Sequence, residues 1–257
     1  MARSKKPSTS EAPVLDAAFW SEFGLDEHAG TRDKLRFLAF AEISRRGILD
    51  VNARWLTDSL HADPSAINYH FGSFDGLIAE VFVTAHELWA EAIRKALAVP
   101  AETPEERLRN VLNAQIARSQ RYGAVVGVAH LPHVSEQVTK ILETEHPGKI
   151  AETVAYAVGV TAHLIRDLRR NVQSPITFAP EDTPVDWTVE HMPLEVHLAS
   201  FVQWSVVGPV LWMTGQGGGV REIENLREDL TSRQLWGGYI DWLVASIQMQ
   251  LSQAPDL

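Results

Sequence analysis

The fold is decided by the stretch Thr31–Leu77, which reads TRDKLRFLAFAEISRRGILDVNARWLTDSLHADPSAINYHFGSFDGL. Over residues 31–46 its apolar side chains recur every three or four positions, the spacing of one face of an α-helix. Gly47 stands where a left-handed C-terminal cap is expected. Asn52 is a good N-cap for a second helix over residues 53–60. The stretch therefore predicts short helices separated by tight turns.

A third and a fourth helix complete this pattern. Asp63 followed by Pro64 combines a capping carboxylate with proline at the first helical position, and the third helix is predicted to run to about His70. Glycine and serine then break it, and a long helix is predicted over residues 74–97. Three short helices before a long one are typical of a helix-turn-helix, whose third helix enters a DNA major groove about 12 Å wide.

At these residues the sequence resembles the TetR family of bacterial regulators. That family begins with an apolar helix closed by glycine, a capped second helix, a turn, and a recognition helix that ends in Tyr-x-His-Phe or similar. The matching positions follow one another without a gap: Leu35, Ala39, Ile43, Gly47, Asn52, Leu56, Leu60, Ile67, Tyr69, His70, Phe71 and Leu77. The resemblance covers about residues 31–82. It implies a ligand-responsive repressor that binds a palindromic operator as a homodimer and is released by a small effector.

The resemblance also implies which residues meet DNA. Arg54 would contact a phosphate beside exposed helix amides, and the amide of Asn68 would pair with adenine. His70 would either contact a phosphate or cap its helix. The predicted DNA-binding residues are Arg54, Ser65, Asn68, Tyr69 and His70.

Several positions depart from the family pattern. Residues 61–63 read His-Ala-Asp where the family usually has Gly-Val-Ser, Asn68 replaces an aromatic residue, and Phe74 replaces a lysine that contacts the DNA backbone. Residues 31–75 hold six basic and six acidic side chains, so their net charge is zero. Because phosphate contacts supply most non-specific affinity, weak DNA binding per copy is expected, unless basic residues near the N-terminus assist. The alternative is a TetR-like ligand sensor or partner-binding protein with weak or lost DNA binding.

Composition limits the class of the whole chain. It has 257 residues, no cysteine and a formal net charge of −10, which argues against a protein that coats nucleic acid through bulk charge. No apolar run is long enough to span a membrane and no secretory signal is evident, so a cytoplasmic location is expected. Sustained period-two alternation is absent from the sequence, which predicts an all-α protein. Further helices are expected at about residues 104–122, 124–131, 134–144, 147–171, 193–214 and 223–251.

These elements suggest three parts: a flexible arm and short helix (residues 1–30), a helix-turn-helix DNA-binding domain (31–77), and a helical ligand-binding and dimerisation domain (78–257). Residues 173–192 form a long irregular connection, either a surface insertion or a lid over a pocket.

The body is expected to hold a pocket between the long helix and the central helices, for a small and largely apolar molecule. Its aromatic and polar candidates are Phe82, His86, Trp89, Tyr122, His130, His133, His163, Trp204 and Trp212. The last two helices are the natural dimer surface, because paired helices from two chains form a four-helix bundle. The residues predicted to face the partner are Leu198, Val202, Trp236, Ile240, Leu243 and Ile247, although packing inside one chain would give the same spacing.

An enzyme is the main competing class. His86-Glu87 begins like a zinc-protease helix, but Ala90 stands where the second histidine is needed. Pro132 interrupts a conceivable metal pair of His130 and His133. A glycine triplet at residues 217–219 lacks the lysine of a phosphate loop. No catalytic residue, metal site or cofactor is therefore predicted.

Overall fold

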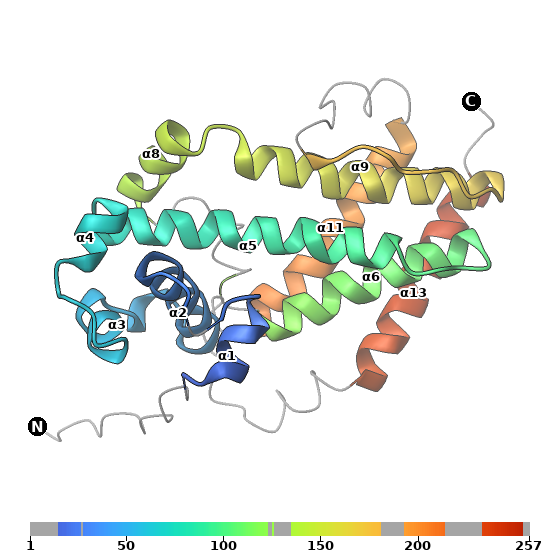
Figure 1. Cartoon of the computed structure of the whole chain (residues 1–257). Helices are drawn as coiled ribbons and strands as arrows, with labels where there is room; N and C mark the ends of the chain where they lie inside the picture. The colour runs from blue at the N-terminus through green and yellow to red at the C-terminus, as the bar shows by residue number, and fades with distance from the viewer. Residues whose placement is uncertain are drawn as a thin grey trace, which may run out of the picture.

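Every regular element of the described chain is helical (Figure 1), which confirms the all-α prediction. The computed structural model describes residues 15–26, 28–122, 125, 135–180, 193–213 and 233–253. Its helices are α1 (Ala17–Glu22), α2 (Thr31–Arg46), α3 (Ala53–Ser59), α4 (Ala66–Phe71), α5 (Phe74–Leu97), α6 (Pro104–Arg121), α8 (Glu136–Glu145), α9 (Lys149–Arg170), α11 (Pro193–Met213) and α13 (Arg233–Gln253), with a short 3₁₀ turn, η1 (Ile48–Asp50). The predicted helix over residues 124–131 lies outside the described residues.

Polar side chains start several of these helices where the sequence places them. The side chain of Asn52 accepts a hydrogen bond from the backbone N–H of Trp55 at 3.0 Å, which confirms it as the N-cap of α3. Ser73 does the same for α5, where its hydroxyl accepts from the N–H of Gly76 at 3.0 Å. Each cap satisfies a backbone donor that the first helical turn leaves unpaired.

Two of the predicted helix ends were wrong in detail. Helix α4 begins at Ala66 and not at Asp63, because the carboxylate of Asp63 accepts hydrogen bonds from the backbone N–H and the hydroxyl of Ser65 and closes a separate turn. These bonds hold the pKa of Asp63 below its usual value. Gly47 does adopt a positive φ of 86°, but its ψ of 162° is extended and not left-handed helical.

The buried side chains form two hydrophobic cores that share α5. The first core joins α1–α4 to the N-terminal half of α5, from Leu77 to Ala85, and to α8. The second core joins the C-terminal half of α5, from Trp89 onward, to α6, α9, α11 and α13. Figure 1 shows α5 running from the small helices at one end into the larger bundle. A movement of α5 would therefore change the packing of both cores.

The predicted dimer-facing residues are instead part of the second core. Helices α11 and α13 turn these side chains toward α6 and α9, so that Leu198, Val202, Ile240, Leu243 and Ile247 are all buried within one chain. The side chain of Trp236 lies outside the description. The exposed apolar side chains of the same two helices are a different set: Phe201, Trp204, Trp242 and Met249.

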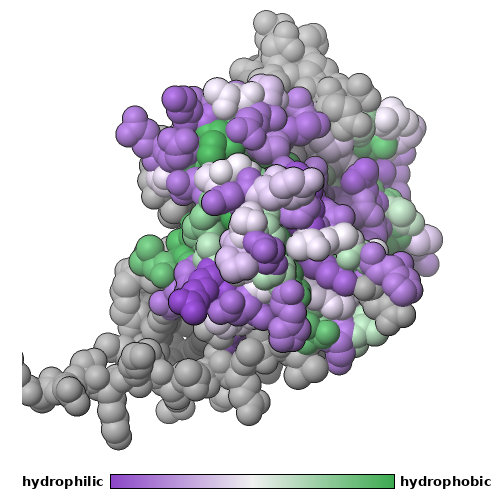
Figure 2. All heavy atoms as spheres, turned by 60° about the vertical axis from the view of Figure 1, so that its left-hand side comes forward, coloured by the Kyte–Doolittle hydropathy of each residue, from purple (hydrophilic) through white to green (hydrophobic). Residues whose placement is uncertain are grey.

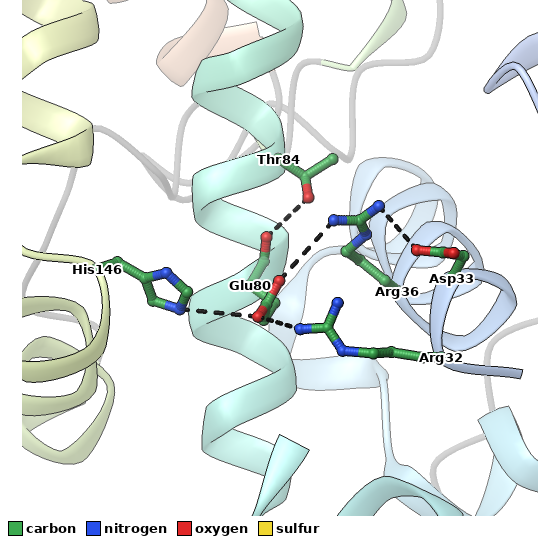
Figure 3. Close-up of polar contacts among 6 residues, drawn as sticks. All are labelled: Arg32, Asp33, Arg36, Glu80, Thr84 and His146. Carbon is green, nitrogen blue, oxygen red and sulfur yellow. Dashed lines mark hydrogen bonds and ion pairs between the residues drawn. The ribbon is translucent and has the colours of Figure 1, made fainter. Parts of the chain in front are cut away.

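Glu80 on α5 links the two parts of the molecule through charged contacts (Figure 3). Its carboxylate lies 2.5 Å from Arg32 Nη2 and 3.9 Å from Arg36 Nη1, both on α2. On its other side His146, in the turn between α8 and α9, approaches it at 3.9 Å. One carboxylate on α5 thus contacts the small helices and the body together.

We expect Glu80→Gln to lower the free energy of unfolding by about 1 kcal/mol, because it removes the carboxylate partner of Arg32 and the longer of the two ion pairs of Arg36, which keeps Asp33. Urea denaturation would measure the loss. Glu91→Gln is the matched control, since Glu91 pairs with Arg94 and Lys95 on the exposed surface, where such pairs contribute about 0–1 kcal/mol. Equal losses in both variants would contradict a special role for Glu80.

Candidate functional site

The turn between α3 and α4 sets the angle at which α4 stands out from the protein. His61 lies in this turn with a positive φ of 51°, and the backbone N–H of Ala62 donates back to the Thr57 carbonyl at 2.9 Å. A left-handed conformation favours glycine, which explains why the TetR pattern usually has glycine in this turn. In this chain a histidine adopts the conformation for which glycine is better suited.

Helix α4 has one face inside the first core and the other in solvent. Ile67 is buried and Phe71 packs against the core. Asn68 and Tyr69 point outward, and Tyr69 is 82 % exposed although it is aromatic. A large, mostly exposed ring on the outer face of a short helix is available to a partner, and major-groove readers present such a helix.

The other predicted DNA-binding residues lie close by. Ser65 and Arg54 are exposed, and the side chain of Arg54 lies 3.6 Å from Asp58 in an exposed ion pair. The ring of His70 is half-buried and contacts the ring of Tyr69 edge-on, with 4.9 Å between their centroids. Figure 2, which turns this end of the molecule forward, shows a largely hydrophilic surface with small separate hydrophobic patches. The structure thus brings the predicted residues together on a polar surface.

Most of the basic side chains of this region have acidic neighbours. These ion pairs join Arg32 to Glu80, Arg36 to Asp33, Arg45 to Glu42, and Arg54 to Asp58. The Arg45–Glu42 pair holds a carboxylate that is itself buried, so it is not easily given up for a phosphate. Among these four arginines, Arg54 has the most exposed side chain and a weak ion pair, which it can give up most easily.

The predicted pocket residues fall into separate places. Phe82, His86 and Trp89 are buried in successive turns of α5, where Phe82 belongs to the first core and Trp89 to the second. Tyr122 instead packs on Phe40 of the first core, with 5.0 Å between ring centroids. The hydroxyl of Tyr122 donates to Glu22, and burial raises the pKa of this phenol to about 12.

Two further candidates lie away from α5. His163 on α9 is buried under Phe178, with 5.2 Å between the rings, and burial lowers the pKa of its imidazole. Trp204 is exposed on α11. His130, His133 and the side chain of Trp212 lie outside the described residues. Among the described candidates, Phe82, His86 and Trp89 are thus neighbours on one helix that pack into two different cores.

Residues 173–180, the described part of the connection after α9, pack against the body. The backbone N–H of Ser174 donates to the buried Asp167 carboxylate at 2.7 Å, and Arg107 donates to the Ser174 carbonyl at 2.6 Å. Phe178 then packs on Tyr156 and His163 of α9. Residues 173–180 therefore cover α9, while 181–192 lie outside the description.

A small cleft of about 160 Å³ lies between α5 and α9. Its walls are mostly polar, and its lining residues are Val83, Glu87, Ala90, Arg94, Lys149, Glu152, Thr153 and Pro180. None of the predicted ligand-binding residues lines this cleft. Among the described residues, no group of three or more histidine and acidic side chains is placed to hold a metal ion.

Arg118 on α6 is a buried polar residue that the sequence interpretation missed. It faces the α5 residues Ala85 and Trp89: its guanidinium lies over the Trp89 ring, 6.0 Å from the centroid, and donates to the Ala85 carbonyl. The indole N–H of Trp89 in turn donates to the side-chain oxygen of Gln115 at 3.1 Å. A weak signal existed, because Arg118 lies three residues after Gln115 and two after the apolar Ile116 on an amphipathic helix.

Comparison with solved structures finds the same overall fold elsewhere. A protein of unknown function from Rhodococcus sp. RHA1 matches with a TM-score of 0.54 and 12 % identity, over 86 % of this chain and 96 % of that one. A Rhodococcus sp. protein provisionally assigned as a TetR-family transcriptional regulator matches with a TM-score of 0.45 and 17 % identity, over 85 % and 96 % of the two chains. No protein-family model and no curated protein matches the sequence. In the part that the structure describes, no helix is both long and apolar enough to cross a membrane.

Proposed function

We propose that this chain is a TetR-like transcriptional regulator that binds a palindromic operator through α4 and responds to a small effector in its body. The observation that carries the proposal is the outward face of α4, where Asn68 and Tyr69 stand exposed on a helix whose other face is locked into the first core. The gap-free sequence resemblance over residues 31–77 supports the same reading.

The proposal includes a homodimer, because one short helix offers too few contacts to select an operator. Dimers of this class read half-sites about 34–36 Å apart. The exposed aromatic side chains of α11 and α13 are the surface we assign to the partner copy. Because α5 joins both cores, an effector that shifts it would change the distance between two recognition helices and release the operator.

Alanine substitutions in α4 test the DNA contact. We expect Asn68→Ala and Tyr69→Ala each to weaken binding to the protein's own promoter by about tenfold or more, the scale of one lost base contact. Gel shifts at low salt would measure this. Gln137→Ala, which removes an exposed side chain from α8, is the control and should bind normally. Unchanged binding in both α4 variants would show that the assignments are wrong.

The ion pairs of the first core favour a second candidate, a TetR-like sensor that no longer binds DNA. Four arginines of residues 31–54 already have acidic partners, so few are available to neutralise phosphates. A regulator that makes phosphate contacts loses affinity with salt, with a slope near −0.9 per contact in a double-logarithmic plot. No promoter shift at the lowest salt would favour the sensor, whereas a shift that weakens with salt would favour the regulator.

A further inference from the structure

Arg118 is a buried cation without a buried anion. It is 8 % exposed, and no carboxylate among the described residues lies within ion-pair distance of it. Its terminal nitrogen Nη2 donates to the carbonyl of Ala85 on α5, but its Nε has no hydrogen-bond partner among the described residues. Burial lowers its pKa to about 9, so at neutral pH it still carries its charge.

Gln115 supplies a second unsatisfied donor on the same face of α6. It lies three residues before Arg118 and is 1 % exposed. Because the indole N–H of Trp89 donates to its oxygen, the orientation of the amide is set, and its nitrogen must seek an acceptor. Within the described part of the chain that nitrogen has no hydrogen-bond partner. The Nε of Arg118 and the amide nitrogen of Gln115 are thus two buried donors on residues one helical turn apart, and no described residue accepts from either.

A buried donor without an acceptor destabilises the folded state. Two such donors close together therefore point to a ligand that accepts their hydrogen bonds. A buried charge is normally paired, and a buried amide is normally hydrogen-bonded. A carboxylate would satisfy both donors, because its two oxygens can accept from a guanidinium and from an amide together. On α5 the two donors contact the aromatic Trp89 and the backbone of the small apolar Ala85. These two α5 residues would pack against a hydrocarbon or aromatic body.

We propose that Arg118 and Gln115 form the anion-binding end of the effector site, and that the effector is a carboxylate with an apolar body. The inference rests on the proposed function only where it calls this ligand an effector. The sequence predicts a largely apolar ligand, and the proposal adds one anionic group to that ligand. The same guanidinium holds the backbone of α5 at Ala85, so a bound carboxylate would act directly on the helix that leads to the recognition helix.

Paired probes that differ only in charge test the proposal on the full chain. Octanoate and phenylacetate are the carboxylates, and octanamide and phenylacetamide are their neutral counterparts. We expect both carboxylates to raise the melting temperature at pH 7.5 and to bind in calorimetry, while the amides bind at least tenfold more weakly. Arg118→Met should remove the preference for carboxylates. Arg170→Gln, an exposed arginine at the end of α9, should leave it unchanged.

A gentler pair of variants covers the case in which Arg118→Met does not fold, as judged by circular dichroism. Arg118→Lys keeps the charge but loses the planar fork, and Gln115→Leu removes the second donor; each should weaken carboxylate binding by about tenfold. Equal binding of carboxylates and amides, or full carboxylate binding in these variants, would overturn the proposal. Gel shifts without ligand separate the two claims: carboxylate binding without DNA binding would refute only the proposed function.

Discussion

Gly76→Ala is expected to abolish operator binding and to lower the free energy of unfolding by about 3 kcal/mol. Gly76 lies in the first turn of α5, and a Cβ atom placed on it would come 2.0 Å from the carbonyl oxygen of Phe71. That oxygen is backbone and belongs to the last residue of α4, so no side-chain rotation relieves the contact. The recognition helix or the start of α5 must move instead.

Two measurements would separate the effects of this change. Urea denaturation gives the loss of stability, and a gel shift at a temperature where the variant is still folded gives the loss of DNA binding. Gly30→Ala is the control, because nothing lies within 4 Å of a Cβ there and its φ is −63°. The control should cost less than about 1 kcal/mol. A Gly76→Ala protein with normal stability and binding would contradict the close packing of α4 on α5.

The helix boundaries were predicted well where the signals are local. The limits of α2 and α5 agree with the predictions at residues 31–46 and 74–97, since glycine, serine and the periodicity of apolar residues act within a turn or two of chain. Asp63 shows where local signals end. Its carboxylate was predicted to cap the third helix. Instead it accepts two hydrogen bonds from Ser65, two residues away, one from the backbone N–H and one from the hydroxyl.

The proposed effector site was less predictable, because the burial of a polar residue depends on residues far away in the sequence. Trp89 was identified as a candidate from its place on α5, and it does lie beside the unsatisfied donors. Arg118 was not identified, since an arginine on an amphipathic helix is normally exposed. Its guanidinium lies against Trp89 and Ala85 of α5, a contact that spacing within α6 does not reveal.

The proposed dimer surface shows most clearly what the periodicity of apolar residues cannot predict. Helices α11 and α13 carry two apolar stripes each, and spacing alone does not say which stripe faces the chain's own core. The stripe of Val202 and Leu243 proved to be internal. The second stripe, with Trp204 on α11 and Trp242 on α13, is exposed. Large exposed aromatic side chains of this kind are typical of interfaces.

The two exposed tryptophans lie on helices that contact one another. The hydroxyl of Tyr239 on α13 donates to the carbonyl of Ser205 on α11 at 2.7 Å, and the ring of Tyr239 stacks on Trp242 with 5.7 Å between centroids. Trp204, next to Ser205, is 65 % exposed and Trp242 is 54 % exposed. The exposed apolar side chains of α11 and α13 are therefore linked through this contact into one candidate surface.

We expect the double variant Trp204→Glu and Trp242→Glu to be a folded monomer that no longer binds the operator. A two-fold interface contains each side chain twice, and an aromatic hot spot contributes about 2 kcal/mol or more. Four lost contacts and the added like charges should weaken the dimer more than about a thousandfold. Light scattering should then give the mass of one chain, 28.6 kDa, and not twice that value.

The fold should survive these substitutions, because both indoles are largely solvent-exposed in a single chain and leave the second core intact. Val99→Glu is the control, since it adds the same charge to an exposed apolar residue in the turn between α5 and α6. A wild-type monomer, or a double variant that remains a dimer, would exclude this surface. A monomeric variant that still binds the full operator tightly would keep the surface but refute the claim that two recognition helices must act together.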